Sequence, residues 1–405
     1  LYRLHFFAQI PYPYGYYLSG FVAFFFLFAI LTGLIIHWNK IVSAFFVFRP
    51  GAKWKTIWTD SHTALGLIGF PFQFVYALTG TYFMLKLIVI SPLITGLYDG
   101  DQQAFRADYA NGKPAQYEFA YTPDSAPGQL DKYRAKAAEE WADFRVKAIN
   151  IQNYGDANMH ITAEGHLAYD QRMTGLGHAT YAVNTGLEVD RKDPVVDNGY
   201  ADGVRSFLYR LHMADYAGYG LRIISFLLGL VGCFVILSGV MIWLVARDKK
   251  TTSAKQKRFN ERTVRWYLAI CMGMFPMIAI EFLIVKLVPE AGMTFIYRTF
   301  FIGWLLIVVG LYFTGNNGRI ARWSLLSGGL AGLLVPLING IMTGDWAWLT
   351  WLRGQTQIAF IDTLWLALAF LAIWTAYRMK GKQIGKPKPA AKPKPLPIED
   401  DVMVG

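Results

Sequence analysis

Long apolar runs separated by short charged segments dominate the pattern along this chain of 405 residues. A helix needs about 20 residues to cross an apolar layer of about 30 Å. Seven runs reach that length, and they are residues 16–38, 64–90, 221–245, 266–288, 295–313, 323–342 and 358–377. We therefore expect an integral membrane protein with about seven transmembrane helices.

Residues 91–205 have a different pattern, because they are polar and acidic. Residues 130–142 have apolar positions at helical spacing, and Asn184-Thr185-Gly186 is typical of a hairpin turn. Strand-like alternation occurs in residues 144–154, 159–163 and 179–183. The predicted fold class is thus an all-α polytopic membrane protein with a small α+β extracytoplasmic domain, in which one helix covers an antiparallel sheet.

Composition supports a membrane protein, since 54% of the residues are hydrophobic and 17% are charged, against about 25% charged in soluble domains. The net charge of +11 comes from basic connections that alternate with the acidic segment. Cytoplasmic loops carry such an excess of Lys and Arg, so the charge indicates topology and contact with anionic lipid, with no nucleic-acid partner. Cys233 and Cys271 lie in apolar runs without a C-x-x-C-H motif, which excludes haem attached through that motif.

Six segments follow from this pattern, in chain order. Residues 1–90 contain two transmembrane helices with a cytoplasmic connection, residues 91–205 form the extracytoplasmic domain, and residues 206–247 form a third transmembrane helix. Residues 248–265 are a basic cytoplasmic linker, residues 266–378 form a four-helix membrane domain, and residues 379–405 are a Lys/Pro-rich cytoplasmic tail. The chain begins without Met or a signal peptide, so we expect the native protein to extend upstream of Leu1.

An internal repeat is the sharpest feature of the sequence. Residues 1–5 read LYRLH, and residues 208–212 repeat these letters. Tyr-Gly follows the first copy at 14–15 and the second at 219–220, and each pair leads into an apolar helix. The repeat predicts that His5 and His212 lie at the same depth, on the same side of the membrane.

Four histidines lie at predicted helix ends, His5 and His212 outside and His37 and His62 at the cytoplasmic side. Ionisable residues at these depths are costly and tend to be functional. Two facing neutral imidazoles form the axial pair of a low-spin haem. Two such pairs predict two haem b groups and a path for electrons across the bilayer.

Arg3 and Arg210 each precede a site histidine by two residues, so both are predicted to pair with haem propionates. Other interpretations stay open. An interfacial histidine can be a plain amphipathic anchor, and Asp60-Ser61-His62 fits a helix N-cap. A zinc site is the third alternative, although further Cys or carboxylate ligands are not positioned for it.

Two further groups carry weaker signals. The remaining histidines lack the spacing of metal ligands, so we expect surface residues; they are His160, His166 and His178. Three charged residues lie within apolar runs, and they are Glu281, Lys286 and Asp362. These indicate either a polar site with a proton relay, or ordinary pairing and snorkelling to the interface.

Several short motifs together resemble the PepSY-associated transmembrane family over residues 1–247. They are Thr32-Gly33-Leu34 with His37-Trp38, Asp60-Ser61-His62, Leu78-Thr79-Gly80, and residues 181–186, which are similar to the closing hairpin of a PepSY domain. The resemblance implies a bacterial inner-membrane protein, often linked to iron and siderophore use. Some members resemble bis-haem reductases that carry cytoplasmic electrons to a periplasmic ferric siderophore. Members usually have another span and PepSY domain upstream, which offers His62 an alternative partner.

The expected function is therefore that of a haem b membrane oxidoreductase. Its inner haem (His37, His62) takes electrons from a cytoplasmic donor, and its outer haem (His5, His212) passes them to a periplasmic ferric chelate or partner protein. Two alternatives remain, a cytochrome b-type subunit of a larger respiratory complex and a non-enzymatic PepSY membrane protein that binds a partner.

Overall fold

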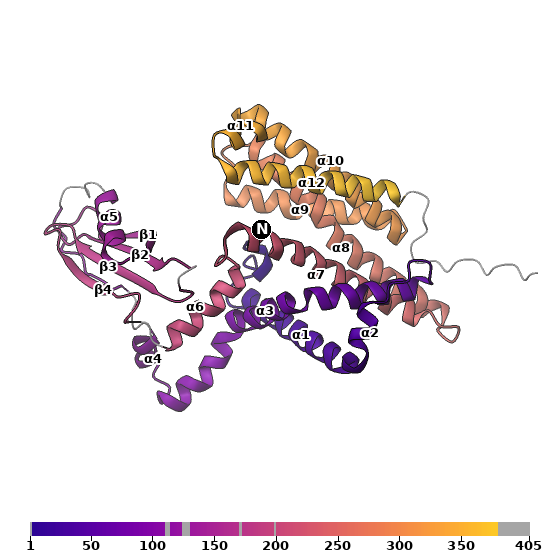
Figure 1. Cartoon of the computed structure of the whole chain (residues 1–405), viewed down its shortest axis with the longest axis horizontal. Coiled ribbons are helices and arrows are strands. Elements are labelled where there is room, and N and C mark those ends of the chain that lie inside the picture. The colour runs from indigo at the N-terminus through magenta and orange to yellow at the C-terminus, as the bar shows by residue number, and fades with distance from the viewer. Residues whose placement is uncertain (1, 110–113, 124–129, 170–171, 198–199, 380–405) are drawn as a thin grey trace, which may run out of the picture. The chain divides into compact units, whose positions relative to one another are not determined.

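The computed structural model describes residues 2–109, 114–123, 130–169, 172–197 and 200–379 (Figure 1). The Lys/Pro-rich tail predicted from residue 379 onward lies outside the described residues except for Met379. Within the described ranges, seven helices are long and apolar enough to cross a membrane. They are α1 (Tyr14–His37), α3 (Trp54–Leu97), α7 (Gly218–Arg247), α8 (Ala254–Leu287), α9 (Met293–Phe313), α10 (Asn317–Thr343) and α12 (Thr356–Arg378). Each contains most of one predicted run, so the predicted number and order of spans are confirmed.

The chain divides into two compact units, Leu1–Val42 with Leu65–Cys233, and Ser43–Ala64 with Phe234–Gly405. Helices α3 and α7 therefore each contribute one part to each unit. The first unit also contains the short helices η1 (Leu4–Phe6), α4 (Gln102–Tyr109) and α6 (Tyr200–Met213), together with all four strands. The second contains most of α2 (Ile41–Phe45), and α8 to α12, including the short α11 (Ala347–Leu352).

In the first unit, α1 and α3 approach closely at Gly20. A Cβ atom at this position would lie 2.6 Å from Leu85 Cδ2 and 2.8 Å from Met84 Cβ. Helix α3 continues through Pro71 and Pro92 to Leu97, although proline removes a hydrogen bond and often ends a helix. The helix thus extends past Ser91, where the polar segment of the sequence begins.

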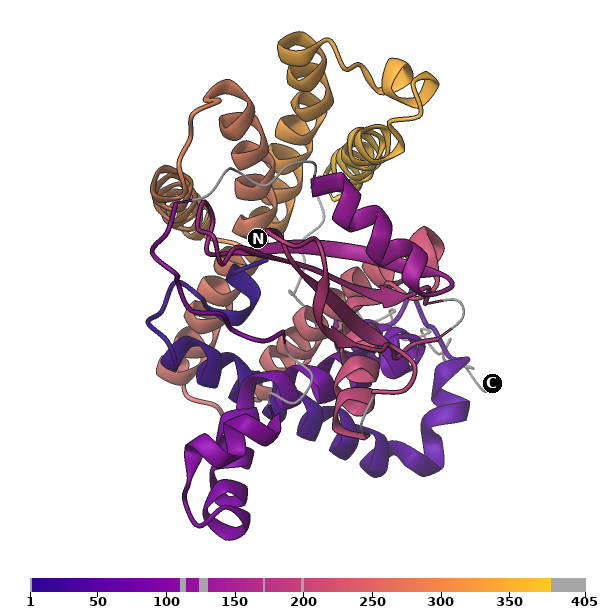
Figure 2. The same cartoon turned by 90° about the vertical axis from the view of Figure 1, so that its left-hand side faces the viewer.

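The four strands form an antiparallel sheet in the order β1-β2-β3-β4. They are β1 (Phe144–Gln152), β2 (His160–Leu167), β3 (Leu176–Ala182) and β4 (Glu188–Lys192). Helix α5 (Leu130–Glu140) lies across one face (Figure 2) and buries Tyr133 and Ala137 against Ile161 and Tyr181. We call residues 130–197 the sheet domain. The predicted helix and the first three strands are confirmed, whereas β4, whose sequence is EVDRK, carries no apolar alternation.

The other face of the sheet is polar and nevertheless buried. His160 and His178 are each 4% exposed, and the hydroxyls of Thr162 and Thr180 lie 2.9 Å apart. The ring of Tyr117 stacks on His160 with a centroid distance of 3.5 Å. The prediction that His160 and His178 are surface residues is therefore wrong. Strand alternation places them on a face that the preceding segment covers, which their spacing in the sequence does not reveal.

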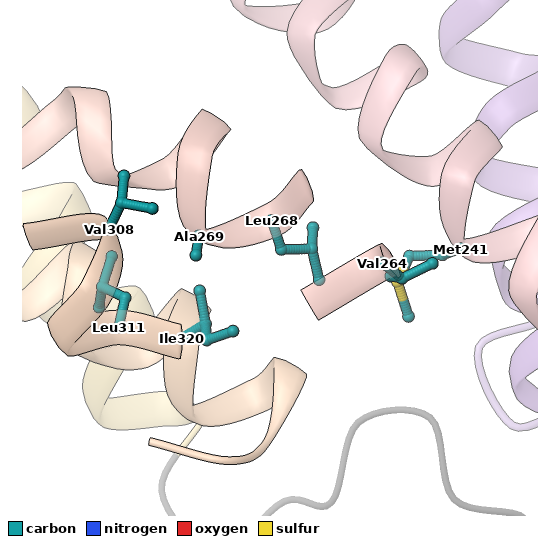
Figure 3. Close-up of a cluster of buried hydrophobic side chains, with 7 residues drawn as sticks. All are labelled: Met241, Val264, Leu268, Ala269, Val308, Leu311 and Ile320. Atoms are coloured by element: carbon teal, nitrogen blue, oxygen red, sulfur yellow. The ribbon is translucent and has the colours of Figure 1, made fainter. Parts of the chain in front are cut away.

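The second unit is held together by apolar side chains from α7, α8, α9 and α10 (Figure 3). The buried members are Met241, Val264, Leu268, Ala269, Val308, Leu311 and Ile320. Helix α10 packs on both α8 and α12 through glycines. A Cβ at Gly328 would meet the ring of Phe275 on α8, and one at Gly329 would meet Ile373 on α12 at 2.7 Å. Small residues allow such close helix contacts in membrane proteins.

Candidate functional site

The first unit brings His5 and His212 together. Their ring centroids lie 6.3 Å apart, and their ring planes differ by 26°. His5 lies in the single 3-10 turn η1, whereas His212 lies near the end of the 14-residue helix α6. The repeated letters thus fold as two different local structures, because the second copy continues a helix and the first does not.

Two neighbours of the Thr79 hydroxyl bear on which ring nitrogen of His212 carries the proton. Thr79 Oγ1 lies 2.6 Å from the carbonyl oxygen of Val75 and 2.8 Å from His212 Nδ1. The hydroxyl has a single proton, and when the Val75 carbonyl accepts it, the Thr79 oxygen accepts from His212 Nδ1–H. In this arrangement the neutral His212 carries its proton on Nδ1, and Nε2 holds the lone pair that can bind a metal.

His5 has the same tautomer for a simpler reason. Its Nδ1 lies 2.6 Å from the carbonyl oxygen of Tyr2, and a carbonyl oxygen only accepts hydrogen bonds. Nδ1 must therefore donate, and in the neutral imidazole the lone pair then lies on Nε2. Among the described residues, neither Nε2 takes part in a hydrogen bond. Partners of this kind at Nδ1 are those that orient metal-binding histidines in proteins.

Aromatic rings from α3 surround His212. Tyr76 and Phe83 both meet its ring edge to face, at centroid distances of 5.6 Å. Tyr76, Thr79 and Phe83 recur at helical spacing and so share one face of α3. Burial, and secondarily the nearby His5, lowers the pKa of His212, which favours the neutral imidazole that a metal requires.

This geometry fits one metal ion between two imidazoles. Two ligands bound at about 2 Å from opposite sides place their ring centroids about 6 Å apart, close to the observed 6.3 Å. Among the described residues, no cluster of three or more His, Cys, Asp or Glu side chains could hold a metal. The pair thus offers two imidazole ligands, which are fewer than a tetrahedral zinc site takes and as many as a haem iron with two histidine ligands takes.

The arginines of the repeat have different surroundings. Arg210 is 4% exposed and its Nη1 lies 2.5 Å from Asp215 Oδ2. Its guanidinium also lies 4.1 Å from the ring centroid of Tyr169. Arg3 is exposed, and Ala8 stands where the second copy has Asp215. Pairing of either arginine with a haem propionate stays a prediction, and the guanidinium of Arg210 already binds a carboxylate.

His62 belongs to the second unit and is held by α7. Its Nδ1 lies 3.0 Å from the carbonyl oxygen of Val235 and 3.1 Å from Ser238 Oγ. Ser238 Oγ itself donates to that carbonyl at 2.8 Å, so both oxygens accept from Nδ1–H. Helix α3 begins at Trp54, eight residues before His62, so the N-cap interpretation of Asp60-Ser61-His62 is wrong.

His37 is the last residue of α1 in the first unit, and it is exposed. The pairing of His37 with His62 stays a prediction.

The model of one protein family, the PepSY-associated TM region, matches residues 1–246 of the chain. The chain belongs to this family. The matched region contains α1, α3 and nearly all of α7, the sheet domain and all four candidate histidines. A comparison with curated proteins finds no match. The chain is thus a multi-pass membrane protein with a PepSY-associated region.

The sequence assigns no role to two residues of this PepSY-associated region, Ser238 and Thr79, although Thr79 belongs to the motif Leu78-Thr79-Gly80. Each hydroxyl oxygen lies within hydrogen-bond distance of a histidine Nδ1, at 2.8 Å for Thr79 and 3.1 Å for Ser238. Each stands directly before a glycine inside an apolar run, and that is the signal that could have identified them. A hydroxyl side chain within an apolar helix normally bonds its own backbone, so the pattern alone does not distinguish a histidine partner.

The polar residues beyond the PepSY-associated region form pairs between neighbouring helices. Thr299 Oγ1 on α9 donates to Glu281 Oε1 on α8 at 3.0 Å. Asn339 Nδ2 on α10 donates to Asp362 Oδ2 on α12 at 3.0 Å. Lys286 is exposed. These pairs satisfy polar groups inside the second unit, and a proton relay through them stays a prediction.

Proposed function

We propose that this chain is a haem b oxidoreductase of the bacterial inner membrane, which passes electrons from a cytoplasmic donor to an acceptor outside. One observation carries the proposal. The ring centroids of His5 and His212 lie 6.3 Å apart, a spacing that two ligands of one iron can have, and the Nδ1 atom of each ring has an oxygen partner, which leaves Nε2 available. Haem, when bound, supplies reversible one-electron chemistry.

The residues around the pair have definite tasks in this proposal. His5 and His212 would hold the iron, while the Tyr2 carbonyl and the Thr79 hydroxyl would hold the rings in the required tautomer. Tyr76 and Phe83 keep water from the His212 side. The Val235 carbonyl and Ser238 hydroxyl orient His62 in the same way, which supports His62 as a ligand of the second haem, with His37 as its proposed partner.

A ferric chelate is the proposed acceptor. Ferric iron prefers hard oxygen ligands, and one-electron reduction weakens their hold on the metal, so that iron is released. The sheet domain, as the PepSY domain of the chain, contacts the ligand helix α6 through Tyr169 and Arg210. We propose that it shapes the surface on which the acceptor binds.

The deciding experiment is a reduced-minus-oxidised absorption spectrum of the detergent-purified protein, with haem counted per chain. We expect a sharp reduced band and about two haems per chain. His212→Ala should lose about half of the haem, because an axial ligand is gone, and all ferric-chelate reductase activity. His178→Gln, on strand β3, is the control histidine and should keep its haem.

Full haem content in His212→Ala would contradict the assignment. A colourless wild-type protein from haem-replete cells would remove the electron-transfer function altogether. The binding partner of the sheet domain would then become the question.

A further inference from the structure

We infer that Thr79 is the positioning residue of this site, and that its hydroxyl sets both the tautomer of His212 and the strength with which this histidine donates to a metal. The inference rests on the proposed haem function for its redox consequence. Its structural consequence, the tautomer, holds with or without haem.

The position of Thr79 leaves it little freedom. The side chain is 0% exposed, and its hydroxyl donates to Val75 within the same helix at 2.6 Å. When the proton lies on the Val75 side, a lone pair of the oxygen points toward His212 Nδ1, which lies 2.8 Å away. Helix α3 thereby orients a histidine of α6, which lies 133 residues later in the chain.

The two proposed axial ligands are consequently unequal. His5 Nδ1 donates to a backbone carbonyl, which no side-chain substitution removes, whereas His212 Nδ1 donates to a hydroxyl that a substitution can delete. An acceptor at Nδ1 raises the basicity of the ligating nitrogen. A more basic imidazole stabilises ferric over ferrous haem, so the Thr79 hydroxyl lowers the reduction potential of the site.

Thr79→Val keeps the shape of the side chain and deletes the acceptor. The Nδ1–H of His212 then lacks its hydrogen-bond acceptor, and this loss favours either the other tautomer or a different orientation of the imidazole ring. We expect haem affinity to fall about 10- to 100-fold, as for other residues that orient a metal ligand. The haem that remains should have a higher midpoint potential than in the wild type.

Two further variants separate the hydroxyl from the fold. Thr79→Ser retains the hydroxyl and should restore wild-type affinity and potential. Thr81→Val is the matched control, because Thr81 Oγ1 likewise donates to a carbonyl four residues earlier, that of Ala77 at 2.7 Å, and has no histidine partner among the described residues. It should change neither quantity.

The measurements are a redox titration of the haem and ¹⁵N NMR of histidine-labelled protein in detergent, which reports the tautomer without haem. A raised potential or lost haem in Thr79→Val, with rescue in Thr79→Ser, supports the inference. The inference is also supported if the ¹⁵N signals of His212 show the Nδ1–H tautomer in the wild type and in Thr79→Ser, and a different tautomer in Thr79→Val. Unchanged potential, haem content and tautomer in Thr79→Val overturn it, as does a serine variant that behaves like valine.

A colourless wild-type protein would defeat the proposed function alone. The tautomer measurement would then still decide the role of Thr79.

Discussion

Oxygen acceptors at Nδ1 determine the chemistry of the histidines at the residue scale. A hydroxyl, a backbone carbonyl, or both together place the proton of His212, His5 and His62. None of these acceptors is charged, so the three histidines make these hydrogen bonds without an ion pair at Nδ1. Such uncharged partners suit a protein interior, where an unpaired charge is expensive.

Asp156 gives the sheet domain a dependence on pH. Burial opposes ionisation of Asp156, but backbone N–H donors, among them Ala120, Asn158 and Thr122, hold its pKa below the usual value. A carboxyl whose pKa is lowered by folding stabilises the fold above its unfolded pKa of about 4. That stabilisation is lost as the pH falls through the folded pKa.

We therefore expect hydrogen exchange in the segments around Ala120 and Asn158 to accelerate when the pH falls below about 4, beyond the intrinsic dependence of exchange on pH. Asp156→Asn should show fast exchange already at pH 7, with little further change in acid. Asp131→Asn is the control, since the side chain of Asp131 is 92% exposed. Mass spectrometry of the full chain gives the measurement, and equal protection in wild type and Asp156→Asn would contradict the expectation.

The periodicity of apolar residues predicts the long helices and most strands, and it fails for elements whose structure depends on tertiary contacts. The seven spans, α5 and three strands follow from apolar spacing. Strand β4 and the helices α4 and α11 lack a long apolar pattern. The repeat brings out His5 and His212 as a pair, but it cannot show that one copy forms a turn and the other a helix, because identical letters have identical propensities.

Close packing by glycine is a property of the helix pair, and α10 with α12 provides the clearest test. A side chain at Gly329 would meet Ile373 Cγ1 at 2.7 Å and the backbone oxygen of Ala369 at 3.1 Å. Gly329→Val should therefore force the helices apart and destabilise the second unit by about 1–3 kcal/mol.

Gly310→Val on α9 is the matched control, because no atom lies within 4 Å of a Cβ built there. Thermal denaturation in detergent should show a lower midpoint for Gly329→Val alone. Equal midpoints for the two variants would show that α10 and α12 do not pack closely at Gly329.

Charge distribution predicts the topology at the scale of the whole molecule. The sheet domain is expected outside and the linker 248–265 in the cytoplasm, because basic connections stay inside. Tyr154 is 66% exposed in the sheet domain, and Lys255 is exposed in α8. Single cysteines at these positions can therefore report the two sides.

In a background with Cys233→Ser and Cys271→Ser, we expect Tyr154→Cys to react with a membrane-impermeant maleimide in spheroplasts. Lys255→Cys should react only after the membrane is permeabilised. Labelling of both positions in intact spheroplasts would contradict the predicted membrane topology.

The proposed site depends on contacts between distant segments, and these limit what the sequence can predict. The spacing of Thr79 and His212, or of Ser238 and His62, carries no periodic signal. Histidines can be selected from the sequence because ionisable residues are rare in apolar runs. Their hydroxyl partners cannot, because threonine and serine are common in membrane helices and usually bond their own backbone.

The contact between Arg210 and Tyr169 has a consequence for thermodynamic linkage. Arg210 and His212 share helix α6, and Tyr169 belongs to the sheet domain. If a molecule binds the sheet domain with an affinity that depends on the position of Tyr169, and if that position alters how His212 binds a metal, the two binding events are coupled. Coupling free energy is reciprocal, so the metal must change the affinity for that molecule by the same factor.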